Sequence, residues 1–118
     1  MPKADAAVRD RGIVGQMLKY CLQIEESLGE IDRSQERFMA SHTYQNAVAM
    51  CILRTGELSK QLSEEFKSAH IHIPWALMAR TRDIYAHRYG SMDFALVWAT
   101  AVGDIPLIKA FCEEFLAQ

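Results

Sequence analysis

One short window of the chain gathers side chains that can bind phosphate and move protons. Residues 73–93 read IPWALMARTRDIYAHRYGSMD. An arginine guanidinium can hold a phosphate group through two parallel hydrogen bonds. A neutral histidine can accept a proton near neutral pH, because the ordinary pKa of its imidazole is about 6.5. The chemically capable side chains of the window are Arg80, Arg82, Asp83, Tyr85, His87, Arg88 and Tyr89.

The spacing of these residues separates two of them. Each residue of a regular helix advances by about 100°, so Asp83 and His87 share one face, where the aspartate can fix the tautomer of the histidine. Arg82 and His87 are offset by about 140° and do not face each other. If both serve one site, the helix unwinds near His87 or the site forms between two copies of the helix. A purely structural interpretation stays open, because His87 and Arg88 also suit the negative end of a helix dipole.

Helices are predicted for the window itself and for most of the chain before it. Pro74 favours a helix start and Gly90 favours a helix stop. A first helix is expected over residues 5–31, with Asp5 as its N-cap. Residues 32–40 are expected to be a connection with at most one helical turn. The first helix carries an apolar stripe at spacings of three and four: Ile13, Met17, Tyr20, Cys21, Ile24, Leu28 and Ile31.

A second long helix is expected to begin after its N-cap, Ser41, and to run to about Lys67. Gly56 and Glu57 lie in its middle, and a solvated glutamate is the default interpretation there. Residues 68–73 are then a short loop.

The end of the chain carries one or two further helices. Asp93 is the predicted N-cap of a helix over about residues 94–101. Residues 103–106, Gly-Asp-Ile-Pro, either kink this helix or separate it from a last one. The sequence therefore predicts an all-α, up-down bundle of four to five helices in a single domain, residues 1–118. The apolar stripes of so short a chain also leave surface that a partner subunit could cover.

Composition limits the class of function. The net charge is −2 and the sequence pI is about 6.1, which argues against a general nucleic-acid coat. Cys21, Cys51 and Cys112 form no CxxC pair, and His70 with His72 makes a weak metal-ligand set, so neither a disulfide framework nor a metal site is expected. No apolar run is expected to approach the roughly 20 residues that span a bilayer, and no signal peptide is expected at the N-terminus. A cytoplasmic protein without a membrane partner is the simplest expectation.

The motif and its surroundings resemble a known family. Residues 82–89 read RDIYAHRY, an R-x4-H-x-Y pattern, and the chain from about Tyr44 to Leu116 resembles the HepT toxins of the HEPN superfamily (higher eukaryote and prokaryote nucleotide-binding domains). Arg88 departs from the family, in which a small residue often stands at this position. The surrounding matches are Gly56-Glu57, Ile73-Pro74-Trp75, Val97-Trp98 and Asp104-Ile105-Pro106.

The resemblance implies a HEPN-like homodimer and a metal-independent ribonuclease without a cofactor, with its RNA cleft at the dimer interface. It implies that His87 acts as the base, that Arg82 binds the scissile phosphate, and that Asp83 orients His87, with Arg88 adding positive charge. It also implies the toxin of a toxin–antitoxin system whose partner is an MntA-like nucleotidyltransferase. That antitoxin would silence the toxin by attaching AMP to Tyr89.

Two alternatives to a ribonuclease remain at this point. The chain could be a non-catalytic helical scaffold that binds and positions a minimal nucleotidyltransferase, which growth arrest on expression would discriminate. A four-helix-bundle metal protein is the weaker alternative, because the sequence lacks the Glu-x-x-His pairs expected on inward faces.

Overall fold

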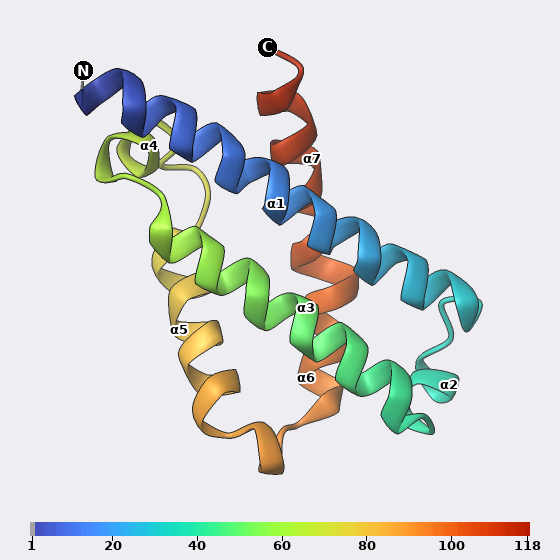
Figure 1. Cartoon of the computed structure of the whole chain (residues 1–118). Coiled ribbons are helices and arrows are strands. Elements are labelled where there is room, and N and C mark those ends of the chain that lie inside the picture. The colour runs from blue at the N-terminus through green and yellow to red at the C-terminus, as the bar shows by residue number, and fades with distance from the viewer. Residues whose placement is uncertain (1) are drawn as a thin grey trace.

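Every regular element of the described chain is helical. The computed structural model describes residues 2–118, with side chains for residues 5–88 and 90–118. A 3-10 turn at Tyr89–Ser91 and a π-helical turn at Thr100–Asp104 complete the regular structure. The predicted all-α class is confirmed. The helices are α1 (Pro2–Glu30), α2 (Gln35–Met39), α3 (His42–Gln61), α4 (Glu64–Ala69), α5 (Trp75–His87), α6 (Phe94–Ala99) and α7 (Ile105–Leu116) (Figure 1).

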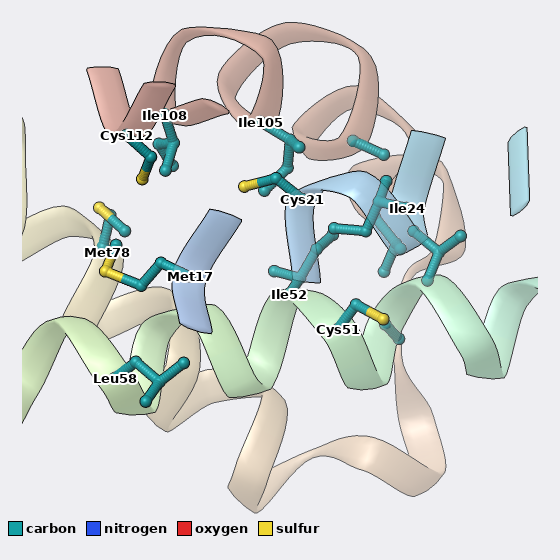
Figure 2. Close-up of a cluster of buried hydrophobic side chains, with 14 of the residues drawn as sticks. Met17, Cys21, Ile24, Cys51, Ile52, Leu58, Met78, Ile105, Ile108 and Cys112 are labelled. Atoms are coloured by element: carbon teal, nitrogen blue, oxygen red, sulfur yellow. The ribbon is translucent and has the colours of Figure 1, made fainter. Parts of the chain in front are cut away.

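The core forms where α1 packs on α3 and α7 (Figure 1). The stripe predicted for α1 is buried there, apart from Tyr20, which is partly buried. Each fully buried aliphatic side chain stabilises the fold by about 1.5–3 kcal/mol relative to an exposed one. Figure 2 shows how the sulfur-containing and branched side chains of the three helices meet. Those that α3 and α7 contribute include Val48, Ile52, Leu58, Ile105, Ile108 and Cys112.

Three cysteines lie in this core as free thiols. Burial raises the pKa of Cys21 and of Cys112 to about 12, and it also raises the pKa of Cys51. A protonated thiol is a poor nucleophile, so these side chains act as small apolar groups.

Two of the three predicted N-caps are confirmed. The Ser41 hydroxyl accepts a hydrogen bond from the backbone N–H of Tyr44 at 3.3 Å, and the Asp93 carboxylate accepts one from that of Ala95 at 3.0 Å. The expectation for Asp5 is wrong, because α1 already begins at Pro2 and Asp5 lies in its first turn. Proline is tolerated in a first turn, where its missing N–H would have had no partner.

The predicted second helix is broken into two. α3 ends at Gln61, Leu62 is extended, and the Ser63 hydroxyl caps α4. The carboxylate of Asp10 on α1 accepts hydrogen bonds from the N–H and the hydroxyl of Ser63 at 2.9 and 2.6 Å. In a helix continuing to Lys67, the N–H of Ser63 would bond to a carbonyl four residues earlier; here Asp10 accepts it instead. The short helices α2 and α4 therefore add to the long ones, and the expected count of four to five helices is too low.

The end of the chain is one continuous helix across the Gly-Asp-Ile-Pro segment. A π-helical turn accommodates Pro106, and the N–H of Ile105 reaches the carbonyl of Thr100 five residues earlier. The resulting helix, Phe94–Leu116, has 23 residues, and its mean hydropathy reaches 1.5, which is long and apolar enough to cross a membrane by length and composition only. The expectation that no apolar run approaches this length is therefore wrong.

In this fold the helix belongs to the bundle. Ile105, Ile108 and Cys112 are buried, and Lys109 forms an ion pair with Glu25 of α1 at 2.8 Å. The core helix of a globular bundle passes the same test of length and composition. Only 22% of its most apolar window is buried in this chain, so much of its apolar surface faces outward.

Helices α3 and α5 approach closely at Gly56. A Cβ atom at this position would lie 2.6 Å from the Cβ of Arg82 and 3.1 Å from the carbonyl oxygen of Met78. One of these neighbours is backbone and cannot rotate away, so only glycine fits the contact without a shift of the helices.

Replacing Gly56 tests this contact. We expect Gly56→Ala to lower the free energy of unfolding by about 1–3 kcal/mol, because the added methyl group forces α3 and α5 apart. The matched control is Gly12→Ala in the interior of α1, where a Cβ meets nothing within 4 Å. This control should be stabilised by about 0.5–1 kcal/mol through helix propensity. Urea unfolding measures both variants, and a gain in stability for Gly56→Ala would contradict the close approach.

Candidate active site

Helix α5 stays helical from Arg82 through His87. His87 is its last residue, and Arg88 follows with φ −123° and ψ 25°, outside the helical region. The helix therefore ends immediately after His87 and not between the two motif residues. Arg82 and His87 remain on different faces of one helix, so unwinding before His87 does not bring them together in this chain.

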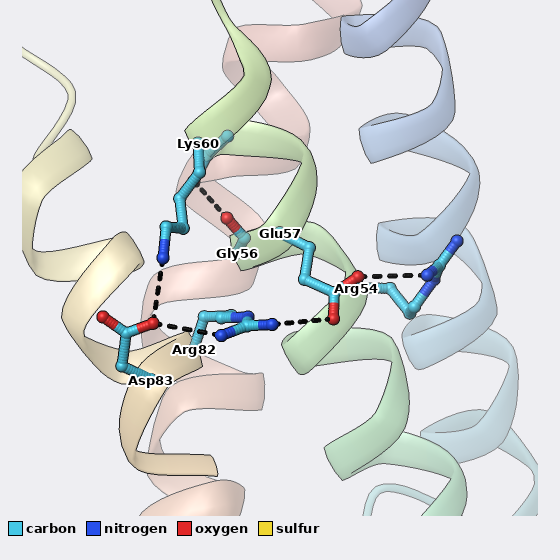
Figure 3. Close-up of polar contacts among 7 residues, drawn as sticks. Arg54, Gly56, Glu57, Lys60, Arg82 and Asp83 are labelled. Atoms are coloured by element: carbon cyan, nitrogen blue, oxygen red, sulfur yellow. Dashed lines mark hydrogen bonds and ion pairs between the residues drawn. The ribbon is translucent and has the colours of Figure 1, made fainter. Parts of the chain in front are cut away.

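Arg82 pairs with two carboxylates, one on α3 and one on its own helix. Its Nη2 lies 3.4 Å from Oε1 of Glu57 on α3, and its Nη1 lies 3.2 Å from Oδ1 of Asp83 (Figure 3). The side chain is 28% exposed, and its Nε is buried without a hydrogen-bond partner among the described residues. The Arg82 side chain is thus partly exposed, and its stem packs at Gly56.

Glu57 corrects the expectation of a solvated glutamate. Its Oε1 pairs with Arg82, and its Oε2 accepts a hydrogen bond from Arg54 at 3.0 Å. The side chain is 27% exposed, well below a free surface glutamate such as Glu64 at 91%. The carboxylate lies between Arg54 of its own helix and Arg82 of α5, because the missing side chain of Gly56 lets α5 come within its reach.

Asp83 joins the same group of charges. Lys60 on α3 donates a hydrogen bond to its Oδ1 at 3.0 Å, beside the contact from Arg82. These hydrogen bonds, from Lys60 first and Arg82 second, hold the pKa of Asp83 below its ordinary value of 3.8. The contact therefore stabilises the fold above that ordinary value and is lost as the pH falls through the lowered pKa. We call the five residues Arg54, Glu57, Lys60, Arg82 and Asp83 the charge cluster.

His87 and Arg88 are exposed at the end of α5. Among the described side chains, Asp83 hydrogen-bonds to Lys60 and Arg82 and not to His87. The predicted contact between Asp83 and His87 is therefore not formed in this chain, and a role of Asp83 in orienting His87 stays a prediction. The backbone of Tyr89 begins the 3-10 turn that follows α5, and its side chain lies outside the described residues.

Two hollows flank the charge cluster. An open one of about 290 Å³ is lined by Glu57, Lys60, Gln61 and Arg82. A larger one of about 390 Å³ lies between α3, α5 and α7 and is mainly apolar. The larger hollow reaches the same turn of α3 at Gly56, so polar and apolar surfaces adjoin there. Its apolar lining includes Ile52, Ile73, Leu77, Met78, Leu107 and Ile108.

His70 and His72 belong to an aromatic cluster. The ring of His70 lies 4.5 Å from that of Phe66 and 5.1 Å from that of Phe111, measured between centroids. Burial, and then the nearby His72, lower the pKa of His70. The described residues contain no group of three or more His, Cys, Asp or Glu side chains that could hold a metal ion.

Reasoning from the sequence missed Arg54, Lys60 and the pairing of Glu57. A signal was present, because charges of alternating sign recur every three residues at Arg54, Glu57 and Lys60, next to a glycine in the middle of a helix. This pattern does not say which face of α3 meets α5, so the partners on α5 had to come from the structure.

The comparisons with known proteins converge on one family. The family described as Ribonuclease HepT-like matches residues 17–115. A relative named probable ribonuclease HepT, from Thermococcus cleftensis, is 38% identical over 91 residues, which cover 77% of this chain and 81% of that protein. A putative RNase of Methanocaldococcus jannaschii is 29% identical over 116 residues, 98% of this chain and 95% of that protein.

A second protein of Methanocaldococcus jannaschii is longer than this chain. It is named gamma-glutamylcyclotransferase and putative RNase, and it is 37% identical over 101 residues, 84% of this chain but 44% of that protein. No solved structure matches the chain significantly. The match to the family spans most of the chain, including the charge cluster and the motif at the end of α5, and the chain therefore belongs to the Ribonuclease HepT-like family of HEPN proteins.

Proposed function

We propose that this chain is a metal-independent endoribonuclease that cuts RNA in a cleft between two copies of the chain. One observation carries the proposal. Within the stretch that matches the HepT-like family, Arg82 is anchored on α3 by Glu57, and His87 stands exposed at the end of the same helix. A phosphate-binding arginine and an accessible, proton-accepting histidine are the two kinds of group on which RNA cleavage without a metal relies.

RNA supplies its own nucleophile in this mechanism. His87 takes the proton of the 2′-hydroxyl, the 2′-oxygen attacks the adjacent phosphorus, and the 5′-oxygen of the next nucleotide leaves. Arg82 binds the non-bridging phosphate oxygens and stabilises the charge that builds on them. A second His87, from the other copy, returns a proton to the leaving oxygen. The products are a 2′,3′-cyclic phosphate and a 5′-hydroxyl, and Arg88 adds positive charge for the RNA backbone beside the cleft.

A second copy is needed because Arg82 and His87 face different directions. The chain offers an apolar surface for it, on α5 and on the continuous helix Phe94–Leu116. Large contiguous apolar surfaces mark interaction sites, and a two-fold axis pairs one such surface with itself. The exposed apolar side chains are Leu77 (48%), Ile84 (52%), Leu96 (63%) and Leu107 (70%).

The same proposal includes a protein partner. The resemblance to HepT toxins supports a cytoplasmic toxin–antitoxin system, in which an MntA-like nucleotidyltransferase attaches AMP to Tyr89. Tyr89 follows His87 by two residues, at the start of the 3-10 turn. An adenylyl group there adds negative charge and bulk beside the proposed phosphate site, and RNA binding would be blocked by repulsion and occlusion.

Substitutions of the two motif residues test the chemistry. We expect His87→Ala to slow cleavage of a labelled RNA by about 10²- to 10⁴-fold in the presence of EDTA, because the proton acceptor is lost. We expect a loss of similar size for Arg82→Ala, because the phosphate charge is no longer stabilised. The products of the native chain should carry cyclic phosphate ends.

Matched variants separate this effect from a general loss of structure. Arg80→Ala removes an exposed arginine of α5, and His42→Ala removes a histidine at the far end of α3, so both should cleave at the native rate. Undiminished cleavage by His87→Ala would remove this residue from the mechanism. If the native chain does not arrest growth yet binds a nucleotidyltransferase tightly, the non-catalytic scaffold is the better description.

A charged side chain in the exposed apolar surface tests the dimer. We expect Leu107→Glu to convert a dimer into monomers and to abolish cleavage, because an unpaired carboxylate would be buried between the copies. The control is Val8→Glu on α1, where the native side chain is 74% exposed. Light scattering coupled to size-exclusion chromatography measures the mass, and a native monomer would contradict the two-copy site.

The modification is tested by intact mass. Incubated with its nucleotidyltransferase partner and ATP, the native chain should gain the mass of one or more adenylyl groups and stop cutting RNA. Tyr89→Phe should gain no mass and keep its activity, whereas Tyr44→Phe should behave like the native chain. An equal mass gain for Tyr89→Phe would assign the modification to another residue.

A further inference from the structure

Arg82 is held at three points by two helices. Its Cβ rests on α3 at Gly56, its Nη2 meets Glu57 at 3.4 Å and its Nη1 meets Asp83 at 3.2 Å (Figure 3). An arginine side chain is long, and ordering it costs about 2 kcal/mol of rotamer entropy. Folding already orders this side chain, because each terminal nitrogen has a carboxylate partner, so a ligand does not have to order it on binding.

The carboxylates do not cancel the charge of Arg82. Glu57 is shared with Arg54 at 3.0 Å, and Asp83 is shared with Lys60 at 3.0 Å. Cations and carboxylates therefore alternate along the charge cluster, with three cations and two carboxylates, so one positive charge remains in excess. This arrangement orients the guanidinium and leaves the surface attractive to a phosphate.

Arg82 keeps N–H donors that its carboxylate partners do not use. Arginine has five N–H donors, and the one on Nε is buried in this chain. Each terminal nitrogen uses one donor on a carboxylate and keeps one. The two free donors belong to the two terminal nitrogens, and an arginine can bind a phosphate through one donor from each of them.

We propose that Glu57 is a positioning residue for RNA cleavage, which orients the guanidinium of Arg82 toward the scissile phosphate. Arg54 balances the negative charge of Glu57. The inference rests on the proposed ribonuclease function of the same site. Glu57 itself touches no reacting atom, and its contribution reaches the phosphate through Arg82. A guanidinium freed from Glu57 would sample other orientations, and a displacement of about 1 Å can cost about 10²-fold in rate.

Glu57→Gln tests the proposal, because it keeps the size of the side chain and removes its charge. We expect kcat to fall by about 10- to 100-fold, with a smaller rise in KM. Glu57→Asp keeps the charge and should recover part of the rate. The matched control is Glu64→Gln on α4, whose side chain is 91% exposed and 3.8 Å from Lys67, and this variant should match the native chain.

A double-mutant cycle shows whether Glu57 acts through Arg82. In an Arg82→Ala background, Glu57→Gln should cause no further loss of rate, because the side chain that it positions is gone. Independent, multiplying losses would overturn the proposal. A rise in kcat for Glu57→Gln would also overturn it, since Glu57 would then restrain Arg82 rather than position it.

A second measurement does not depend on activity. In protein labelled with 15N-arginine, the terminal N–H signals of Arg82 should be separate in the native chain, because both nitrogens are held. They should merge in Glu57→Gln and stay separate in Glu64→Gln, with the melting temperature of each variant recorded beside them. Unchanged Arg82 signals in Glu57→Gln would overturn the inference.

The two measurements separate the inference from the function on which it rests. If the native chain cuts RNA and Glu57→Gln cuts it equally well, the positioning role is wrong and the ribonuclease stands. If the native chain cuts no RNA, the proposed function is wrong, and the role of Glu57 in cleavage is wrong with it.

Discussion

The close approach of α3 and α5 at Gly56 is the constraint on which the rest of the site depends. The missing Cβ lets the backbone of α5 rest against α3, and this contact sets the position of Arg82. Glu57, the next residue on α3, then comes within reach of the guanidinium. A larger residue at position 56 would move both helices, because one of its neighbours is the carbonyl oxygen of Met78. The charge cluster is thus a consequence of helix packing, and it would not form from its charges alone.

The same packing explains why one chain does not assemble the whole proposed site. Because α5 is fixed on α3 through Arg82 and stays helical to its end, His87 points about 140° away from that contact. The apolar side chains of α5 and of Phe94–Leu116 remain exposed on this chain. In the proposed dimer, one contact covers the exposed apolar side chains and brings two α5 helices together, so that Arg82 of one copy can meet His87 of the other.

Local patterns in the sequence were sufficient for much of the fold. The stripe of α1 was read from its spacing, and the caps at Ser41 and Asp93 were read from residue type, because both depend on neighbours within a turn or two. The break between α3 and α4 was not predictable in this way, since it depends on Asp10 bonding to Ser63 across 53 residues. At residues 103–106 the sequence predicted a kink or a break, and the π-helical turn before Pro106 instead keeps the helix continuous.

The site shows the same division between local and tertiary information. The order of the motif residues along α5 predicted that Arg82 and His87 would diverge, and they do. The partner of Asp83 could not be predicted, because helical spacing allowed His87 while the neighbouring helix supplied Lys60. The sequence predicts a solvated Glu57, because local spacing does not show which face of α3 turns toward α5. That orientation is set by the packing of the two helices.

The three buried cysteines have a consequence for following this molecule in solution. Cys21, Cys51 and Cys112 come from three different helices of one core, and burial keeps their thiols protonated. Alkylating reagents attack the thiolate, so modification waits until a helix separates from its neighbours. The order in which the three thiols react would therefore show which of α1, α3 and α7 detaches first, without any added label. The native cysteines thus serve as probes of the order in which the core opens.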